Sequence, residues 1–399
     1  MATVALLATA CGNKPLDTFD DQGPAARDIN SVILPVFGIA IIVLILVSGA
    51  ILFTAWRNRV SAKDAEAAAL ANGTDADPTG LYGDDEFPEQ VHGNTTLEIG
   101  WTVIPTVILS VVAVFTLIGI FKLNDVSADE GDLRVTIVGQ QWWWEYQYHL
   151  DGDTDTPPDF VNANELVIPA GQQVPLVVTS RDVIHSWWIP QLNGKRDALP
   201  LGTSPWTIEA DDPGRYKGVC TEFCGLSHAY MRMFTIALSP EDWDAWAENQ
   251  ILPATVPEVG TPEDAGWQIY QANCAQCHVI TGLTDTNLDG EIDDWDIYDG
   301  PNQISPALLS GAAPNLTHFA SRTTYAGSIF DLYVDRAEGS DYLDVAAEGD
   351  VDVGQLTAWL RNAPAEKANR WQDGRGMPAF TNLTPDDITN LIAFLTSLD

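Results

Sequence analysis

Two long apolar segments limit what this chain can fold into. Ser31 to Trp56 and Ile99 to Phe121 contain no charged residue. Each is long enough to cross the hydrocarbon core of a bilayer as one helix. Arg57 and Arg59 follow the first segment, and basic residues favour the cytoplasmic side of a membrane. The sequence therefore predicts a transmembrane hairpin with a cytoplasmic loop over residues 31–125, which places both flanking parts of the chain outside the cytoplasm.

A short apolar run precedes the hairpin and ends at a cysteine. Leu6 to Cys11 reads LLATAC, which resembles the lipobox of a bacterial lipoprotein. Cleavage before Cys11 would leave a lipid-bearing N-terminus on the outer face of the membrane. We therefore expect residues 1–30 to be a lipoprotein-like signal and N-terminal segment, with membrane lipid as a partner.

The charge balance excludes one class of partner. The chain has 56 acidic and 19 basic residues, for a formal net charge of −37. Such a chain repels phosphate backbones, so we expect no nucleic-acid partner. The same charge would attract a basic protein. The alternative interpretation is a general adaptation for solubility.

After Asp125 the pattern changes to short segments rich in β-branched and aromatic residues with period-two alternation. Gly, Pro and Asp turns separate them, which is typical of a β-sandwich. Trp144 and Tyr146 fall on one side of such a strand and are expected in the core. The predicted strands of this domain, residues 126–250, are Leu133 to Gly139, Trp144 to Leu150, Gln173 to Ser180, Trp206 to Glu209, Arg215 to Cys220 and Met233 to Leu238.

A loop between the last two predicted strands carries soft ligands. Cys220 to Met231 contains two thiols, an imidazole and a thioether, a donor set that suits copper. A single-copper electron-transfer site needs one thiolate, whereas two thiolates at this spacing can bridge a pair of copper ions. A disulfide and a zinc site built from Cys, Cys and His are the alternatives. His185, in the aromatic segment Asp182 to Pro190, offers a further imidazole.

The last third of the chain contains a second cysteine motif. Cys274-Ala275-Gln276-Cys277-His278 is the attachment signature of c-type haem, in which both thiols bind the haem and His278 binds its iron. A zinc site or a redox disulfide is the alternative. Met377 is the single methionine of this region and lies in a Gly-x-Met-Pro segment like that of class I cytochromes c, so it is the expected sixth iron ligand, with His318 as the competitor.

Helix-start signals divide the C-terminal part. Ser239, Thr261 and Thr384 each precede Pro and two acidic residues, a pattern that predicts a capped helix start. Spaced prolines make residues 251–260 a semi-extended linker, which would tether residues 261–399 as an all-α domain.

The copper loop and the His185 segment together resemble one family closely. The patterns C-x-E-x-C-x-x-x-H-x-x-M and D-V-x-H-S-[FW]-W are similar to those of subunit II of haem-copper cytochrome c oxidases. With a C-terminal cytochrome c domain, the resemblance is to the caa3 type. It implies a cupredoxin fold and a dinuclear copper A centre. The ligands implied by the resemblance are the side chains of His185, Cys220, Cys224, His228 and Met231 and the backbone carbonyl of Glu222.

The resemblance assigns roles to three further side chains. Trp142 matches the tryptophan that lies over copper A and relays electrons. Glu98 matches a glutamate at the mouth of a proton channel in subunit I, although an interfacial anchor is the alternative. The side chain of Glu222 matches a ligand of a magnesium ion at the interface with subunit I.

An acidic stretch after the haem signature fits a calcium-binding loop of the EF-hand type. Oxygen donors stand at positions 1, 3, 5, 9 and 12, with Gly at position 6. The alternative is an ordinary solvated loop. The candidate calcium ligands are Asp285, Asn287, Asp289, Glu291 and Asp296.

These observations predict a multidomain membrane protein with a two-helix transmembrane hairpin, an all-β cupredoxin-like sandwich and an all-α cytochrome c domain. The resemblance implies subunit II of a caa3-type oxidase in a bacterial or archaeal plasma membrane, with the copper and haem domains on the outer face. Electrons from cytochrome c or a cytochrome-containing complex would pass through haem c and copper A to subunit I. There oxygen is reduced to water and protons are pumped, with subunit III as a further partner. The alternative is an electron-transfer subunit of another terminal enzyme, such as a copper-A nitric oxide reductase.

Overall fold

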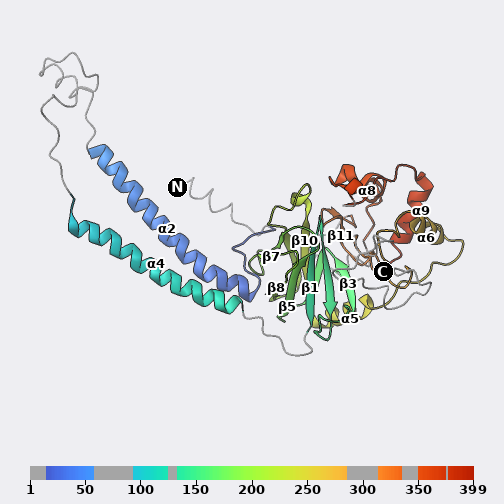
Figure 1. The fold of residues 1–399 in the computed structure, drawn as a ribbon, viewed down its shortest axis with the longest axis horizontal. Helices are drawn as coiled ribbons and strands as arrows, with labels where there is room; N and C mark the ends of the chain where they lie inside the picture. Colours follow the sequence, from blue (N-terminus) through green and yellow to red (C-terminus); the bar gives the residue numbers. More distant parts are fainter. Residues whose placement is uncertain (1–14, 58–92, 125–132, 285–312, 335–348, 374–375) are drawn as a thin grey trace, which may run out of the picture. The chain divides into compact units, whose positions relative to one another are not determined.

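The computed structural model describes residues 15–57, 93–124, 133–284, 313–334, 349–373 and 376–399 (Figure 1). The chain divides into two compact units. One unit is Asn30–Lys122, and the other combines Met1–Ile29 with Leu123–Asp399. Cys11 and all five candidate calcium ligands lie outside the described residues.

Two long helices make up the described part of the first unit. They are α2 (Pro24–Arg57), which begins in the other unit, and α4 (Thr95–Leu123). Both are long and apolar enough to cross a membrane, and their apolar windows are 0% buried within the chain. A bilayer would cover these side chains, because exposed apolar surface of this extent is unfavourable in water. The predicted pair of membrane helices is thus present, with α2 beginning before Ser31.

Two sheets build the sandwich. The larger has strand order β3-β2-β1-β5-β8 and the smaller has β4-β10-β9, while β6 and β7 form a separate pair. The strands are β1 (Arg134–Gln140), β2 (Trp143–His149), β3 (Phe160–Ala163), β4 (Glu165–Pro169), β5 (Val174–Ser180), β6 (His185–Trp187), β7 (Arg196–Ala198), β8 (Ser204–Ile208), β9 (Gly214–Val219) and β10 (Arg232–Leu238). Each of the six predicted strands corresponds to one of these. The prediction missed β3, β4, β6 and β7, which have at most five residues each and lack clear alternation.

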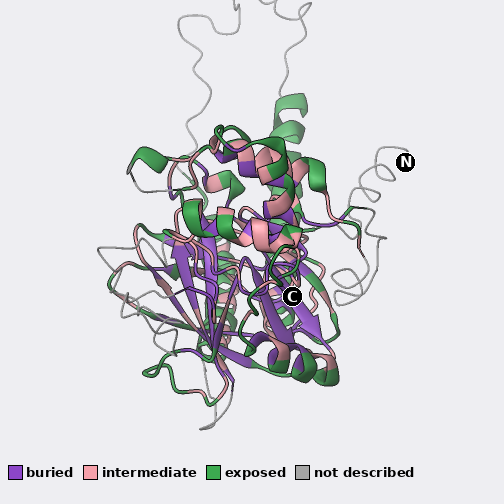
Figure 2. Ribbon diagram, turned by 90° about the vertical axis from the view of Figure 1, so that its right-hand side faces the viewer, coloured by how far each residue is buried: buried purple, intermediate pink, exposed green. Residues whose placement is uncertain are grey.

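The core of the sandwich lies between the sheets, where the strands are largely buried (Figure 2). Trp144 and Tyr146 are fully buried, which confirms their expected place in the core. Strand β2 is buried along its whole length. Helix α5 (Pro240–Gln250) contributes to this burial, because the ring of Trp246 lies 5.6 Å from that of Tyr148. The aromatic segment therefore forms a rigid support for the loops at the end of the sheet.

Helices are the main regular elements in the described parts of the C-terminal region. It contains α6 (Pro262–Asn273), α8 (Val353–Glu366) and α9 (Pro385–Leu395). The expectation of an all-α domain is met only in part, because β11 (Thr324–Tyr325) and β12 (Phe330–Asp331) form a short antiparallel ribbon.

The predicted helix caps are present. Ser239, Thr261 and Thr384 each accept a hydrogen bond from the backbone N–H three residues later, at the starts of α5, α6 and α9. These bonds satisfy amide groups that have no partner within the helix.

The crossing of α6 and α9 depends on a glycine. A Cβ atom on Gly266 would lie 2.1 Å from the carbonyl oxygen of Asn390 and 2.6 Å from Cβ of Phe394. The two helix backbones can approach this closely only because Gly266 has no side chain.

We therefore expect Gly266→Ala to destabilise the C-terminal region. In an exposed helix this substitution normally stabilises by about 1 kcal/mol, but overpacking here would cost about 1–3 kcal/mol. Hydrogen exchange of the α6 and α9 amides in the full chain would measure the effect. Gly354→Ala in α8 is the control, because its Cβ would meet nothing closer than 3.5 Å. Equal protection in the two variants would contradict the role of the crossing.

Candidate metal centre and cofactor cavity

The loop from Cys220 to Met231, here called the cysteine loop, is held at both ends by the smaller sheet. Strands β9 and β10 pair antiparallel up to Val219 and Arg232, and the loop connects them, as the sequence predicted. Just beyond the last pair, the amide N–H of Cys220 donates to the carbonyl of Met231 at 3.0 Å. A single 3-10 turn, His228–Tyr230, shapes the far side of the loop. The sheet therefore fixes the positions from which the ligand side chains project.

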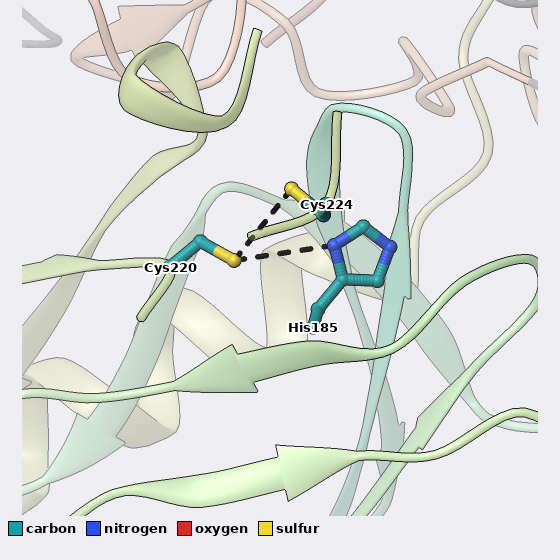
Figure 3. Close-up of side chains that lie close together, drawn as sticks. All are labelled: His185, Cys220 and Cys224. Carbon is teal, nitrogen blue, oxygen red and sulfur yellow. Dashed lines mark hydrogen bonds between the residues drawn. The ribbon is translucent and has the colours of Figure 1, made fainter. Parts of the chain in front are cut away.

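The ligand atoms expected from the sequence come together around the two thiols. The Sγ atoms of Cys220 and Cys224 lie 3.8 Å apart. Figure 3 shows that the ring of His185 faces this pair, with Nδ1 4.0 Å from the sulfur of Cys220. The remaining three contacts join the Sγ of Cys220 to the carbonyl oxygen of Glu222 (3.3 Å), and the Sγ of Cys224 to Nδ1 of His228 (3.5 Å) and Sδ of Met231 (3.8 Å).

The thiols are free and buried, and their titrations are linked. The hydrogen bond that the two sulfurs share lowers the pKa of Cys220 to about 4, although burial opposes this shift. The same contact and burial raise the pKa of Cys224 far above its usual value. At neutral pH the pair therefore holds one proton, which a metal ion must displace, because thiolates are the metal-binding form.

A carboxylate orients His185. Nε2 of the ring lies 2.8 Å from Oδ1 of Asp182, which leaves Nδ1 toward the sulfurs. Burial lowers the pKa of His185, but Asp182 and Cys220 together raise it above its ordinary value. Burial raises the pKa of Asp182, yet hydrogen bonds from His185 and two backbone amides make the net shift downward. Asp182 is a candidate positioning residue for His185, and sequence analysis gave it no role although it lies in the same segment, Asp182 to Pro190.

Trp142 and its neighbour bind the cysteine loop directly. The Nε2 group of Gln141 donates to the carbonyl oxygen of Cys224 at 2.6 Å, and the Nε1–H of Trp142 donates to the same oxygen at 3.1 Å. Gly225 permits this approach, because it has a φ of +114° and a Cβ there would lie 3.0 Å from Nε2 of Gln141. The turn between β1 and β2 is therefore attached to the loop that carries the thiols.

A cavity of about 400 Å³ contains the second cysteine motif. Its lining includes Cys274, Cys277, His278 and Met377, together with Trp142 from the sandwich. The sequence motif and the single methionine of the C-terminal part therefore meet in one space. That space also reaches the turn that binds the cysteine loop.

The two histidines of the C-terminal region have different surroundings. Nδ1 of His278 lies 2.7 Å from the carbonyl oxygen of Pro314, so Nδ1–H donates and Nε2 is available for a metal. His318 does not line the cavity, and its Nε2 lies 3.0 Å from the carbonyl oxygen of Leu252. This arrangement favours His278 with Met377 over the competing His318.

The thiols of this cavity differ chemically from those of the loop. Burial raises the pKa of Cys274 to about 12, with a smaller effect from Cys277. Burial also raises the pKa of Cys277. Both groups are therefore held as neutral thiols, whereas Cys220 is a ready thiolate. Among these four thiols, Cys220 alone has a lowered pKa.

Two candidate side chains lie apart from these sites. Glu98 is in the first turn of α4, in the membrane unit, and its side chain is exposed within the chain. Glu222 contributes its carbonyl to the thiol cluster while the residue itself is exposed.

Comparisons with known proteins identify relatives of this chain. The family model for the periplasmic domain of cytochrome c oxidase subunit II matches residues 133–238, and the model for its transmembrane domain matches residues 82–118. The chain is 31% identical to cytochrome c oxidase subunit 2 of Alkalihalophilus pseudofirmus over 405 residues, covering 100% of this chain and 95% of that one. It is 28% identical to the same subunit of Bacillus sp. (strain PS3) over 330 residues, covering 79% and 78%. The crystal structure of the periplasmic domain of subunit II from Bradyrhizobium japonicum covers 31% of this chain and 96% of its own, at 29% identity and a TM-score of 0.27.

We expect Asp182→Asn to weaken metal binding at the cysteine loop. An amide cannot hold the His185 ring as a carboxylate does, and loss of such a partner typically lowers metal affinity by about 10- to 100-fold. Competition with a copper chelator would measure the change in the purified protein. Asp244→Asn, on the exposed side of α5, is the matched control and should leave the affinity unaltered. An affinity equal to that of the unsubstituted chain would show that Asp182 does not position His185.

Proposed function

The chain belongs to the cytochrome c oxidase subunit II family, and from this premise we propose that it is a caa3-type subunit that passes electrons from haem c through copper A to subunit I. Membership gives the chain a membrane anchor and a periplasmic copper domain in a haem-copper oxidase. The observation that carries the finer proposal is that Trp142 lines the cavity of the haem-attachment motif and also donates to the carbonyl of Cys224. One residue therefore adjoins both candidate redox sites.

The cysteine loop would hold the copper. Two thiolates between two imidazoles, with a thioether and a carbonyl beyond them, match the soft and borderline ligands that copper prefers. The proposed ligands are His185, Cys220, Cys224, His228, Met231 and the carbonyl of Glu222.

The cavity would hold haem c. Its neutral thiols can form thioethers with the haem, which does not require a low thiol pKa. His278 presents Nε2 on one side, and Met377 is the single methionine of the lining. A haem with His and Met ligands has a raised potential.

When bound, the copper centre and the haem would each accept and release single electrons. The chain supplies rigid placement for this task. Strands β9 and β10 fix both ends of the cysteine loop, and Asp182 fixes His185. The side chains of Gln141 and Trp142 donate to the carbonyl of Cys224. The backbone amide of Gln141 in turn donates to the carboxylate of Asp182, which fixes the turn. Water is excluded from the thiols, both of which are buried.

The partners follow from the proposed path. Subunit II associates with subunit I, and we propose subunit III and a cytochrome c or cytochrome-containing donor as further partners. Glu98 is proposed for proton entry, and the side chain of Glu222 for magnesium at the subunit I interface. Calcium binding by the acidic loop remains a proposal on residues outside the described part of the chain. Oxygen chemistry and the site that couples it to proton pumping belong to subunit I.

A copper-A nitric oxide reductase is not favoured as the enzyme that this chain serves. The two relatives described above, which match most of the chain, are both named cytochrome c oxidase subunit 2. The purified complex should therefore consume oxygen with reduced cytochrome c as donor. Consumption of nitric oxide in place of oxygen would overturn the assignment.

We expect a substitution in one of the two cysteine sites to remove the spectral signal of that site and to leave the signal of the other site intact. Cys220→Ser should remove the mixed-valence EPR signal of a two-copper centre and leave the haem spectrum intact, because one thiolate cannot bridge two ions equally. Met377→Ala should remove the sulfur-to-iron charge-transfer band and leave the copper signal intact. EPR and optical spectra of the full chain would measure both.

Met233→Leu is the control for these variants. Met233 is fully buried in the sandwich core two residues after Met231, and its loss should alter neither spectrum. A full dinuclear signal in Cys220→Ser would refute the bridging assignment, and absence of covalently bound haem from the unsubstituted chain would refute the caa3 assignment.

A further inference from the structure

Buried polar contacts connect the C-terminal region to the sandwich. The bonded residues are far apart in the sequence, and both the sandwich and the C-terminal region supply donors. The amide of Arg232 donates to the carbonyl of Gly327 at 3.1 Å, and the hydroxyl of Ser227 donates to the carbonyl of Ala368. A flexible tether alone would not produce such contacts, so the boundary has the character of an interface.

Lys367 enters the sandwich side of this interface. The residue follows α8 directly and is 7% exposed. Its Nζ group donates to the carbonyl of Trp142 at 2.7 Å and to the carbonyl of Ala326 at 2.9 Å. One ammonium group therefore joins the turn of the larger sheet to the β11–β12 ribbon. Lysine side chains are rarely buried in proteins, so the burial of Lys367 in this interface is unusual.

The surroundings make this burial costly. Desolvation lowers the pKa of Lys367 to about 7, the charge of Arg232 acts in the same direction, and Cys224 opposes it. Among the described residues no carboxylate forms an ion pair with Lys367. An apolar residue of similar volume would avoid this cost. The carbonyls of Trp142 and Ala326 are the hydrogen-bond partners that offset part of this cost.

Glu165 enters the opposite side of the interface. It is fully buried at the start of β4. Its carboxylate accepts hydrogen bonds from the amide of Thr323 (3.1 Å), the hydroxyl of Thr323 (2.6 Å) and the hydroxyl of Thr324 (2.6 Å). Each part of the chain thus places one ionisable side chain among polar groups of the other, and such bonds need a fixed geometry.

We propose that Lys367 and Glu165 dock the C-terminal region on the sandwich in one fixed position. Lys367 is then the positioning residue for the turn of Gln141 and Trp142 between β1 and β2, here called the Trp142 turn. For electron transfer the proposal rests on the proposed function, because it assumes redox groups in the cavity and in the cysteine loop. The sequence predicted only a tether at residues 251–260, and a tether alone would let the reach of the linker set the effective concentration of the donor. Transfer would instead proceed from a docked state.

Two substitutions separate the contributions from each side. Lys367→Met keeps the length and the apolar stem and removes both donors. Glu165→Gln keeps the shape and replaces an acceptor oxygen by an amide that cannot accept. Lys195→Met and Glu258→Gln are the matched controls, because both residues are exposed. Thr323→Val is a milder variant, which removes one hydroxyl donor to Glu165 without altering side-chain size.

Hydrogen exchange tests docking without reference to any cofactor. The amides of Thr323 and Arg232 donate across the interface, and they should exchange faster in the full-length Lys367→Met and Glu165→Gln variants. Loss of hydrogen bonds to charged groups should lower the ratio of docked to undocked forms by roughly tenfold or more. The controls should match the unsubstituted chain. Unaltered exchange in both variants and in Thr323→Val would overturn the docking.

Electron transfer from haem to copper tests the positioning role. After photoreduction of the haem in the full chain, the rate should be independent of solvent viscosity, because no domain motion is required. In Lys367→Met it should fall by up to roughly tenfold, the limit reached when the undocked form predominates, and become dependent on viscosity, with unchanged haem and copper spectra. A purely local loss of stability would not introduce that dependence.

The outcomes separate this inference from the function on which it rests. Absence of covalent haem or of the two-copper signal refutes the proposed function, while the exchange measurement still tests docking. Both cofactors present, with equal and viscosity-independent rates in Lys367→Met and the unsubstituted chain, refutes the positioning role alone.

Discussion

The hydrogen bonds to the carbonyl oxygen of Cys224 connect the two sites of this chain. Gln141 and Trp142 both donate to that oxygen, so the turn between β1 and β2 cannot move without the loop that carries the thiols. The backbone of the same turn accepts from Lys367 on its other side. The Trp142 turn is therefore held between the cysteine loop and the C-terminal region, and the relation of the two candidate redox sites depends on it.

Most of the candidate ligands could be named from the sequence because they lie in two short motifs, Cys220 to Met231 and Cys274 to His278, whereas His185 and Met377 lie far from these motifs along the chain. Strands β9 and β10 fix both ends of the segment from Cys220 to Met231, while Gln141 and Trp142 hold its middle from outside the motif. The six predicted strands and the capped helices also follow from local signals, namely alternation and hydroxyl caps. These features need no knowledge of which distant residues meet.

The contacts that the sequence did not reveal are long-range pairings of polar residues. Glu165 and Lys367 look like surface residues in a chain with 56 acidic and 19 basic side chains, yet both are buried. Nothing local distinguishes them, because their hydrogen-bond partners are 41 to 225 positions away. Strands β3, β4, β6 and β7 were missed for a related reason, since pairing with other strands defines them more than their own alternation does.

The two cysteine pairs show how the fold assigns different chemistry to the same side chain. Cys220 has a neighbouring thiol and an imidazole that stabilise its thiolate, whereas Cys274 has mainly an apolar cavity that favours its neutral form. A metal that competes for thiolates would therefore meet less resistance at the loop than in the cavity. Trp142 adjoins both environments, because it lines the cavity and donates to the carbonyl of Cys224.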